Sequence, residues 1–342
     1  MSLVRGKKEL LAKVLFGSGT IVERVFGSRP SDRLLVLAYH RICDLPAEGY
    51  PFQHETVSAT PEQFDRQLDF IKRRFEVVNF HRLAEMEKSG DPLPPNLLVI
   101  TFDDGYEDNY TVALPIRKAH SLTATVYVST GFIDSGQTFW FEMLSYYVMR
   151  MKPGVIRLRE SELHLKLTDA NRHEVRRVIG RGMRVVADRT RLAMLEELKQ
   201  QAGVAPSDDE LALVRPLSWQ QVRTLDAAGV EIGSHTVTHP FLVQLDVEEL
   251  AAELGGSKAR IEEETGRKVS SLAYPTGGSE FFDERAVRLA GEFGYRYAVS
   301  YDHATVRADS LKRFEIPRIH VEPEVSDPLF KANLMLPRVF VR

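Results

Sequence analysis

Residues 97–106 read Leu-Leu-Val-Ile-Thr-Phe-Asp-Asp-Gly-Tyr, an apolar run that ends in two adjacent carboxylates and a glycine. The run is typical of a buried strand, and Asp103-Asp104-Gly105 predicts the loop that follows it. In parallel α/β folds, active sites form where strands end. Adjacent acids repel each other and are commonly placed together for a cation. The alternative interpretation is a simple Asp-Asp-Gly turn, which is common in loops.

Six further apolar runs of strand type alternate with helical patterns. The runs are residues 34–38, 77–80, 123–128, 230–233, 270–274 and 296–300. Helix starts are marked by capping boxes at Thr60, Ser218 and Asp246, each followed three residues later by Gln or Glu. This alternation predicts parallel βαβ units, hence a barrel or a doubly wound sheet. Residues 134–215 show no convincing strand, and we expect a mainly helical insertion there; a separate small domain is the alternative.

The composition indicates an ordinary globular protein. The chain has 342 residues, 43% hydrophobic and 27% charged, with a net charge of −3. This balance excludes a disordered, collagen-like or fibrous chain, and it gives no electrostatic case for nucleic acid as a partner. The single cysteine, Cys43, excludes a disulfide framework and a Cys-rich zinc site.

The N-terminal 30 residues carry six basic and two acidic side chains. Their apolar residues recur at helical spacing and predict a basic amphipathic helix. They are Leu10, Leu11, Val14, Leu15, Val22 and Val25. The favoured interpretation is a helix packed on its own domain (residues 31–342), and the alternative is contact with a membrane surface or a partner. Because no apolar stretch suits a signal peptide or a span, we expect a cytoplasmic enzyme, with peripheral contact at the inner membrane face as the alternative.

A second motif, Ser-His-Thr-Val-Thr-His-Pro at residues 234–240, follows another strand-like run. Two imidazoles four residues apart can converge on one metal ion, and Pro240 disfavours a helix at His239, so the pair belongs to a turn. One Asp and two His leave a coordination position for water, which is the mark of a catalytic ion. Zinc is the default, and cobalt, nickel or iron would suit the same ligands. No organic cofactor is expected.

With these two motifs together, residues 34–133 and 216–320 resemble the polysaccharide deacetylases, the NodB-homology group or carbohydrate esterase family 4. The resemblance implies a distorted, incomplete (β/α)7-8 barrel, which agrees with the alternation. It also implies that Asp103 is the general base and that Asp104, His235 and His239 hold the metal.

The family's third motif, usually similar to Arg-Pro-Pro-Tyr-Gly, corresponds to residues 273–277, Ala-Tyr-Pro-Thr-Gly. Ala273 replaces the arginine that steadies the catalytic aspartate. Arg318 is our candidate for the missing role, and Arg41 is a second candidate. By the same resemblance, the backbone amide of Thr276 would help to stabilise the oxyanion.

The family's acid histidine normally comes late in the chain, but here His40 follows the first predicted strand. This order resembles a circularly permuted branch similar to the poly-N-acetylglucosamine deacetylases. We therefore expect His40 to be the general acid, with His320 as the second choice. Aromatic residues 139–141 could stack on a sugar ring, but the favoured interpretation is that they are core residues that join the insertion to the barrel. Five other histidines are interpreted as surface or structural: His54, His81, His120, His164 and His173.

The expected function is metal-dependent removal of N-acetyl groups from an amino-sugar glycan or a lipid-linked saccharide. One alternative keeps the metal hydrolase but changes the substrate to another amide or an O-acetyl ester. A less favoured alternative is a non-catalytic glycan-binding protein of the same fold.

Overall fold

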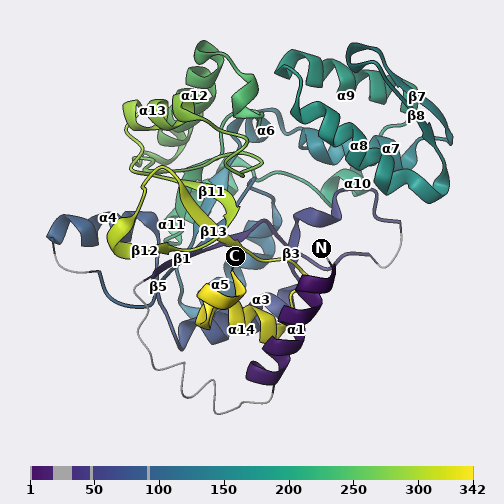
Figure 1. The fold of residues 1–342 in the computed structure, drawn as a ribbon. Coiled ribbons are helices and arrows are strands. Elements are labelled where there is room, and N and C mark those ends of the chain that lie inside the picture. Colours follow the sequence, from purple (N-terminus) through teal and green to yellow (C-terminus); the bar gives the residue numbers. More distant parts are fainter. Residues whose placement is uncertain (1, 18–32, 47–48, 91–92, 342) are drawn as a thin grey trace.

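A computed structural model describes residues 2–17, 33–46, 49–90 and 93–341, and its centre is a closed barrel of seven parallel strands (Figure 1). The order around the barrel is β1 (Arg33–Tyr39), β13 (Ile316–His320), β11 (Tyr297–His303), β10 (Ser271–Ala273), β9 (Glu231–Ser234), β6 (Thr125–Val128) and β5 (Leu97–Phe102). The ring closes because β1 also pairs with β5. Two short strands flank it, β4 (Glu76–Val78) beside β5 and the antiparallel β12 (Val306–Arg307) beside β1. The predicted α/β barrel is confirmed.

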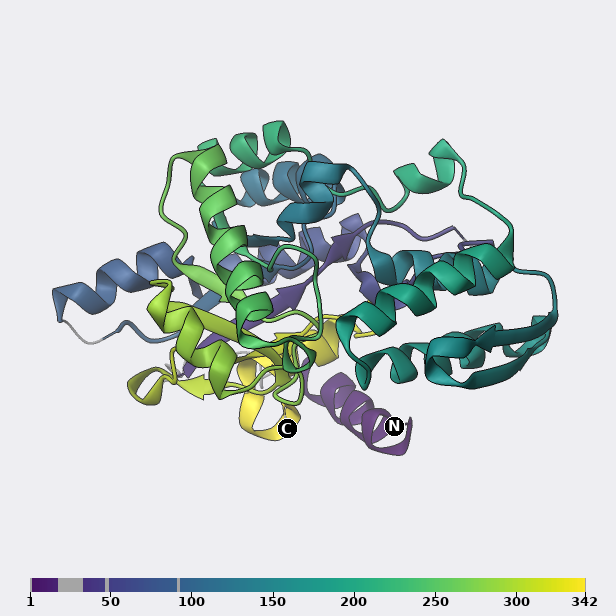
Figure 2. The ribbon, with the colours of Figure 1, turned by 90° about the horizontal axis from the view of Figure 1, so that it is seen from above.

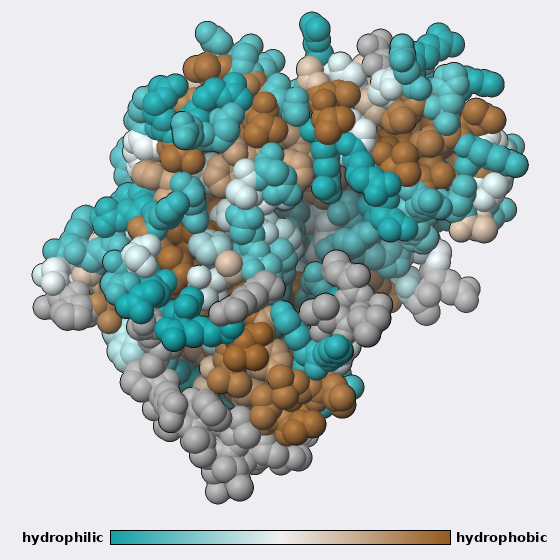
Figure 3. All heavy atoms as spheres, viewed as in Figure 1, coloured by the Kyte–Doolittle hydropathy of each residue, from teal (hydrophilic) through white to brown (hydrophobic). Residues whose placement is uncertain are grey.

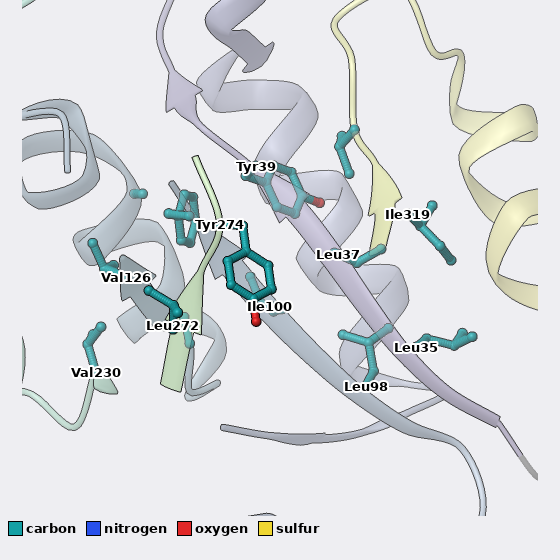
Figure 4. Packing of buried hydrophobic residues seen from close by; sticks show 14 of the residues in the cluster. Leu35, Leu37, Tyr39, Leu98, Ile100, Val126, Val230, Leu272, Tyr274 and Ile319 are labelled. Atoms are coloured by element: carbon teal, nitrogen blue, oxygen red, sulfur yellow. The ribbon is translucent and has the colours of Figure 1, made fainter. Parts of the chain in front are cut away.

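Side chains alternate between the inside and the outside of the barrel, as the period of a strand requires. Leu98 and Ile100 of β5 pack outward with the surrounding helices, and Figure 4 shows Leu98 beside Leu35 of the neighbouring strand β1. Val99 belongs to a separate cluster that fills the interior with residues of the other strands. By the same alternation Thr101 and Asp103 face inward, so the second half of β5 carries polar groups into the barrel.

Helices surround the barrel and cover its amino-terminal end. The surrounding helices are α3 (Pro61–Lys72), α5 (Leu114–His120), α6 (Thr130–Ser135), α11 (Trp219–Ala227), α12 (Val247–Thr265), α13 (Glu284–Glu292) and α14 (Asp327–Met335). The three predicted capping boxes are present, at Thr60, Ser218 and Asp246. Helix α4 (Phe80–Ser89) contributes Phe80 and Leu83 to the interior cluster, so it closes the end of the barrel opposite the site.

The segment after α6 forms a lobe beside the barrel (Figures 1 and 2). It contains α7 (Trp140–Arg150), β7 (Gly154–Leu158), β8 (Leu163–Leu167), α8 (Arg172–Arg184), α9 (Asp188–Ala202) and α10 (Asp208–Ala212). The lobe has its own buried apolar cluster, which Tyr106 and Phe241 join to the barrel loops. The expectation that this segment contains no strand is wrong, because β7 and β8 form an antiparallel hairpin. Their apolar signal is weak since only one face of the hairpin is buried.

Helix α1 (Ser2–Phe16) packs along α14 at the side of the barrel. Ala12 and Phe16 are buried there, and Arg5 forms an ion pair with Glu322 at 3.1 Å. Among the helices described, none is long and apolar enough to cross a bilayer. The predicted helical positions Val22 and Val25 lie outside the described residues.

Two short elements lie between β1 and α3: β2 (Arg41–Ile42) pairs in parallel with β3 (Val57–Ala59). A last short helix, α15 (Pro337–Phe340), follows α14 and packs against it.

Candidate active site

The predicted site residues converge at the carboxyl ends of the barrel strands. Asp103 and Asp104 follow β5, His235 and His239 follow β9, and His40 follows β1. All five line one cavity of about 720 Å³, together with Thr276 from the loop after β10. The other wall of the cavity comes from the lobe formed by α7 to α10.

Asp104, His235 and His239 form a compact group that could hold a metal ion. Oδ1 of Asp104 lies 3.3 Å from Nε2 of each histidine. Nδ1 of His235 lies 2.8 Å from the carbonyl oxygen of Ala273, which can only accept, so Nδ1 carries the proton and Nε2 has a free lone pair. Oδ1 of Asp104 is buried and has no hydrogen-bond partner among the described residues. An unpartnered carboxylate oxygen facing two imidazole nitrogens fits a divalent transition metal ion.

Backbone strain is concentrated in these loops. Asp104, Thr236, His239 and Thr276 all have left-handed φ angles, of 71°, 66°, 54° and 57°. Such conformations cost on the order of 1–3 kcal/mol each in residues other than glycine, and they persist only where the surroundings hold them. Here one of the holding contacts is clear, because Nε1 of Trp140 donates a 2.9 Å hydrogen bond to the carbonyl oxygen of His239.

The pKa values of Asp104, His235 and His239 are shifted by burial and by one another. Burial alone raises the pKa of a carboxyl, but His235 and His239 hold the pKa of Asp104 well below its usual range. Burial lowers the pKa of His239, which favours the neutral imidazole that binds metal. Burial also opposes the charged form of His235, but the neighbouring Asp104 and Asp103 raise its pKa above the ordinary value. A bound cation would oppose that rise.

Asp103 is held by Arg318, one of the two arginines considered for this role. The guanidinium donates two hydrogen bonds of 2.7 Å, one to each carboxylate oxygen, and both side chains are buried. Burial alone would raise the pKa of Asp103, but Arg318 and His235 keep it below the usual value. Arg41 does not reach the site, because it pairs with Asp108 at 2.8 Å.

Ala273 and Arg318 lie on two different strands of the barrel, β10 and β13. Ala273 belongs to the cluster that fills the barrel interior, so its side chain faces inward from β10. Arg318 is fully buried and enters from β13, two strands away in the barrel order. It also donates to the carbonyl oxygen of Ser300 at 2.9 Å and to Oγ1 of Thr101 at 3.1 Å.

His40 and His320 lie in different surroundings. Nε2 of His40 lies 3.9 Å from Oδ2 of Asp103, and its ring lines the cavity. Nε2 of His320 lies 2.6 Å from the carbonyl oxygen of Tyr301, and its ring stacks on Tyr301 with centroids 3.7 Å apart. Burial lowers the pKa of His320 to about 3. His320 is therefore neutral and engaged in packing, whereas His40 faces the cavity.

Thr276 and the aromatic residues complete the cavity. No described residue accepts a hydrogen bond from the backbone N–H of Thr276, and Thr276 lines the cavity. Phe141 lies with its ring centroid 5.0 Å from that of His239, and Trp140 packs beside it. Both are buried core residues, as expected, and both also line the cavity.

Tyr301 was missed by the sequence analysis. It lines the cavity and contacts the rings of both His40 and His320, but nothing in its local sequence marks it. His54, interpreted as a surface residue, is exposed at the rim of the same cavity.

Comparison with known proteins places this chain in a family. The family model for polysaccharide deacetylase matches residues 90–298, which is more than half of the chain. The chain therefore belongs to the polysaccharide deacetylase family.

One curated relative is the poly-beta-1,6-N-acetyl-D-glucosamine N-deacetylase of Escherichia coli (strain K12). It is 31% identical over 90 residues, which cover 26% of this chain and 13% of the relative. The matched part is thus a small fraction of that protein.

Solved structures share the fold. The Streptococcus pyogenes deacetylase PplD, in complex with acetate, matches with a TM-score of 0.60 at 18% identity, over 90% of this chain and 99% of that one. IcaB from Ammonifex degensii matches with a TM-score of 0.53 at 18% identity, over 91% and 98% of the two chains.

Proposed function

We propose that this protein is a metal-dependent deacetylase that removes N-acetyl groups from an amino-sugar glycan or a lipid-linked saccharide. The observation that supports it most is the pairing of Asp103 with Arg318 directly beside the group of Asp104, His235 and His239. A buried carboxylate held ionised next to a metal-binding group is what a general base for water requires. The family membership and the printed name of the Escherichia coli relative support the same chemistry.

The proposed reaction assigns one task to each residue. A divalent ion held by Asp104, His235 and His239 would polarise the acetamide carbonyl and make a nearby water more acidic. Asp103 accepts the proton of that water as its oxygen attacks the carbonyl carbon. The free N–H of Thr276 donates to the developing oxyanion. Protonated His40 then gives its proton to the departing nitrogen, so acetate and an amino sugar are released.

Other substrates remain as a second proposal. Another amide or an O-acetyl ester could be attacked by the same residues, and an ester would depend less on His40 because an alcohol leaves more easily than an amine. A purely glycan-binding protein is disfavoured, because such a protein would not need Asp103 held ionised by a buried arginine. That the early position of His40 reflects a circular permutation stays a prediction.

The test measures acetate released from N-acetylglucosamine oligomers and from a lipid-linked N-acetyl sugar, with zinc, cobalt or a chelator. Wild type and Asp103→Asn are compared. Metal-dependent release that disappears in the variant supports the proposal. Absence of release while stoichiometric metal is bound would point to another amide or ester. Absence of both release and metal binding would overturn the catalytic proposal.

We also propose that α1 lets the protein lie against an anionic membrane surface. Leu10, Leu11 and Val14 are exposed, and Lys7 lies on the same face of the helix because it is three, four and seven residues away. Figure 3 shows a hydrophobic patch over α1 and the C-terminal helices. Exposed apolar residues next to lysines suit the headgroup region of anionic lipids.

Co-sedimentation with vesicles of anionic or neutral lipid tests this proposal. Leu11→Ser combined with Val14→Ser should release the protein from anionic vesicles, whereas Val155→Ser, at an exposed position on β7, should not. Equal sedimentation of all three proteins would overturn it.

A further inference from the structure

The wall of the cavity formed by α8 is unusually cationic. The helix contains five arginines and one glutamate, in a chain whose net charge is −3. Arg177, Arg181 and Arg184 are exposed and line the same cavity as Asp104 and the two histidines. In Figure 3, hydrophilic residues gather along the rim of the hollow between the lobe and the barrel.

The spacing of these arginines makes them one continuous row. Positions 177, 181 and 184 are separated by four and three residues, so they project from one face of the helix. The row spans about 10 Å at the rise of an α-helix. The opposite face of α8 is buried through Val175 and Ile179, which fixes the row toward the cavity.

The guanidinium groups of the row have no carboxylate partners among the described residues. Arg177 donates only to a carbonyl oxygen of its own helix at 3.3 Å, and Arg184 lies over the ring of Phe281 at 5.2 Å. Arg181 has no hydrogen bond or ion pair within the described chain. The neighbouring Arg176, by contrast, is paired with Glu55.

The acidic residues across the cavity do not neutralise the row. Glu322 and Glu324 line the other wall, and both interact with Arg5 of α1, at 3.1 and 4.0 Å. A solvated helix face normally alternates its charges, because like charges one turn apart repel each other. Three arginines without carboxylate partners, spaced one helical turn apart on the same face, therefore indicate a binding surface for an anion.

We infer that this arginine row, Arg177, Arg181 and Arg184, binds a phosphate or diphosphate group on the saccharide substrate. One carboxylate is satisfied by one guanidinium, which can hold both its oxygens. Three guanidinium groups along about 10 Å match a group with more charge and more acceptor oxygens, as a sugar diphosphate has. Trp140 and Phe141 line the cavity with the row and the metal-binding group, and they offer apolar surface to the sugar ring.

This inference rests on the proposed deacetylation and names its substrate class. The shared chemistry is a sugar linked through a diphosphate, whether the diphosphate carries a lipid or a nucleotide. The reaction itself is unchanged, and the row contributes only to binding. Loss of the row should therefore raise KM and leave kcat nearly unchanged.

The kinetic test uses four acetylated substrates: neutral N-acetylglucosamine oligomers, hyaluronan oligomers that carry carboxylates, UDP-N-acetylglucosamine, and N-acetylglucosamine diphosphate linked to a short isoprenoid alcohol. The variant is Arg177→Gln with Arg181→Gln. The matched control is Arg189→Gln, an exposed arginine of α9 that does not line the cavity. For at least one diphosphate substrate, the double variant should raise KM by about tenfold or more. For the neutral oligomers, its KM should differ from that of wild type by less than about twofold.

The two diphosphate substrates show which group the diphosphate carries besides the sugar. A preference for the isoprenoid-linked substrate indicates a lipid, and a preference for UDP-N-acetylglucosamine indicates a nucleotide. If the double variant changes KM equally for the neutral and the diphosphate substrates, the inference is overturned. A preference for hyaluronan oligomers over both diphosphates would also overturn it. The single variant Arg181→Gln, with a smaller change of charge, repeats the test if the double variant is unstable.

A binding measurement separates this inference from the proposed reaction. Calorimetry with inorganic pyrophosphate needs no catalysis, and we expect the double variant to bind about tenfold more weakly than wild type or Arg189→Gln. If pyrophosphate binding depends on the row but no substrate releases acetate, the anion site stands and the deacetylase proposal fails. If acetate is released but pyrophosphate binds wild type and double variant equally, the anion site is refuted.

Discussion

Replacement of Arg318 by methionine removes the group that holds Asp103. Arg318 supplies two of the hydrogen bonds to this carboxylate, at 2.7 Å each, and Asp103 is only 2% exposed. Breaking a buried ion pair from one side costs about 3–5 kcal/mol, because the remaining charge stays buried without compensation. Two charge-assisted hydrogen bonds at about 1.5–3 kcal/mol each give a similar sum.

The loss of activity should be larger than the loss of stability alone would explain. Without the guanidinium, the buried carboxyl favours its protonated form, and a protonated Asp103 cannot accept a proton from water. Its orientation is lost as well. We expect kcat/KM for acetate release to fall by about 100-fold or more, while stoichiometric zinc binding is retained.

The assay combines urea unfolding, zinc stoichiometry and acetate release at a temperature where the variant is folded. Arg41→Met is the matched control, because Arg41 is also buried and paired with a carboxylate, that of Asp108. It should lose a similar amount of stability but less than about threefold in kcat/KM. If Arg318→Met loses no more activity than Arg41→Met, the positioning role of Arg318 is refuted.

Three further predictions follow from the site. His40→Gln should lower kcat on an N-acetyl substrate by about 10²–10⁴-fold but affect an O-acetyl ester far less; equal losses on both would contradict its role as the acid for nitrogen. Zinc should raise Tm of the wild type relative to the chelated protein, and His239→Ala should abolish this rise; an unchanged rise would place the metal elsewhere. Burial lowers the pKa of His320 to about 3 in the folded state, against about 6.5 when unfolded, so below pH 6.5 the unfolded state binds more protons and stability falls as the pH falls. Between pH 6.5 and 5, His320→Gln should lose about 1–2 kcal/mol less of its free energy of unfolding than wild type, as measured by urea titrations. The exposed His164→Gln should lose as much as wild type.

The barrel and the group of Asp104, His235 and His239 could be predicted because their signals are local. Strand β5 is a continuous apolar run, and its carboxylates follow directly, as do the two histidines after β9. Strand β13 was not predicted because it is short and contains Pro317 and Arg318. It is a strand because β1 and β11 pair with it on both sides, which is information from distant parts of the chain.

The partner of Asp103 could be proposed only as a choice between Arg318 and Arg41 for the same reason. The two residues of the observed pair are 215 positions apart in the sequence, and the closure of the barrel brings them together. The arginine row of α8 shows a regular spacing in the sequence, but the sequence alone does not reveal which face of the helix turns toward the cavity. Similarly, Tyr301 acquires its contacts only when β11 lies beside β13.

The entry of Arg318 from β13 bears on how relatives of this protein are compared. By the resemblance to the third family motif, Ala273 stands where an arginine is usual, so a comparison of the motifs alone would score that arginine as lost. In the structure, the buried guanidinium of Arg318 donates a hydrogen bond to each carboxylate oxygen of Asp103. The positive charge beside Asp103 thus comes from a strand that the third motif does not include.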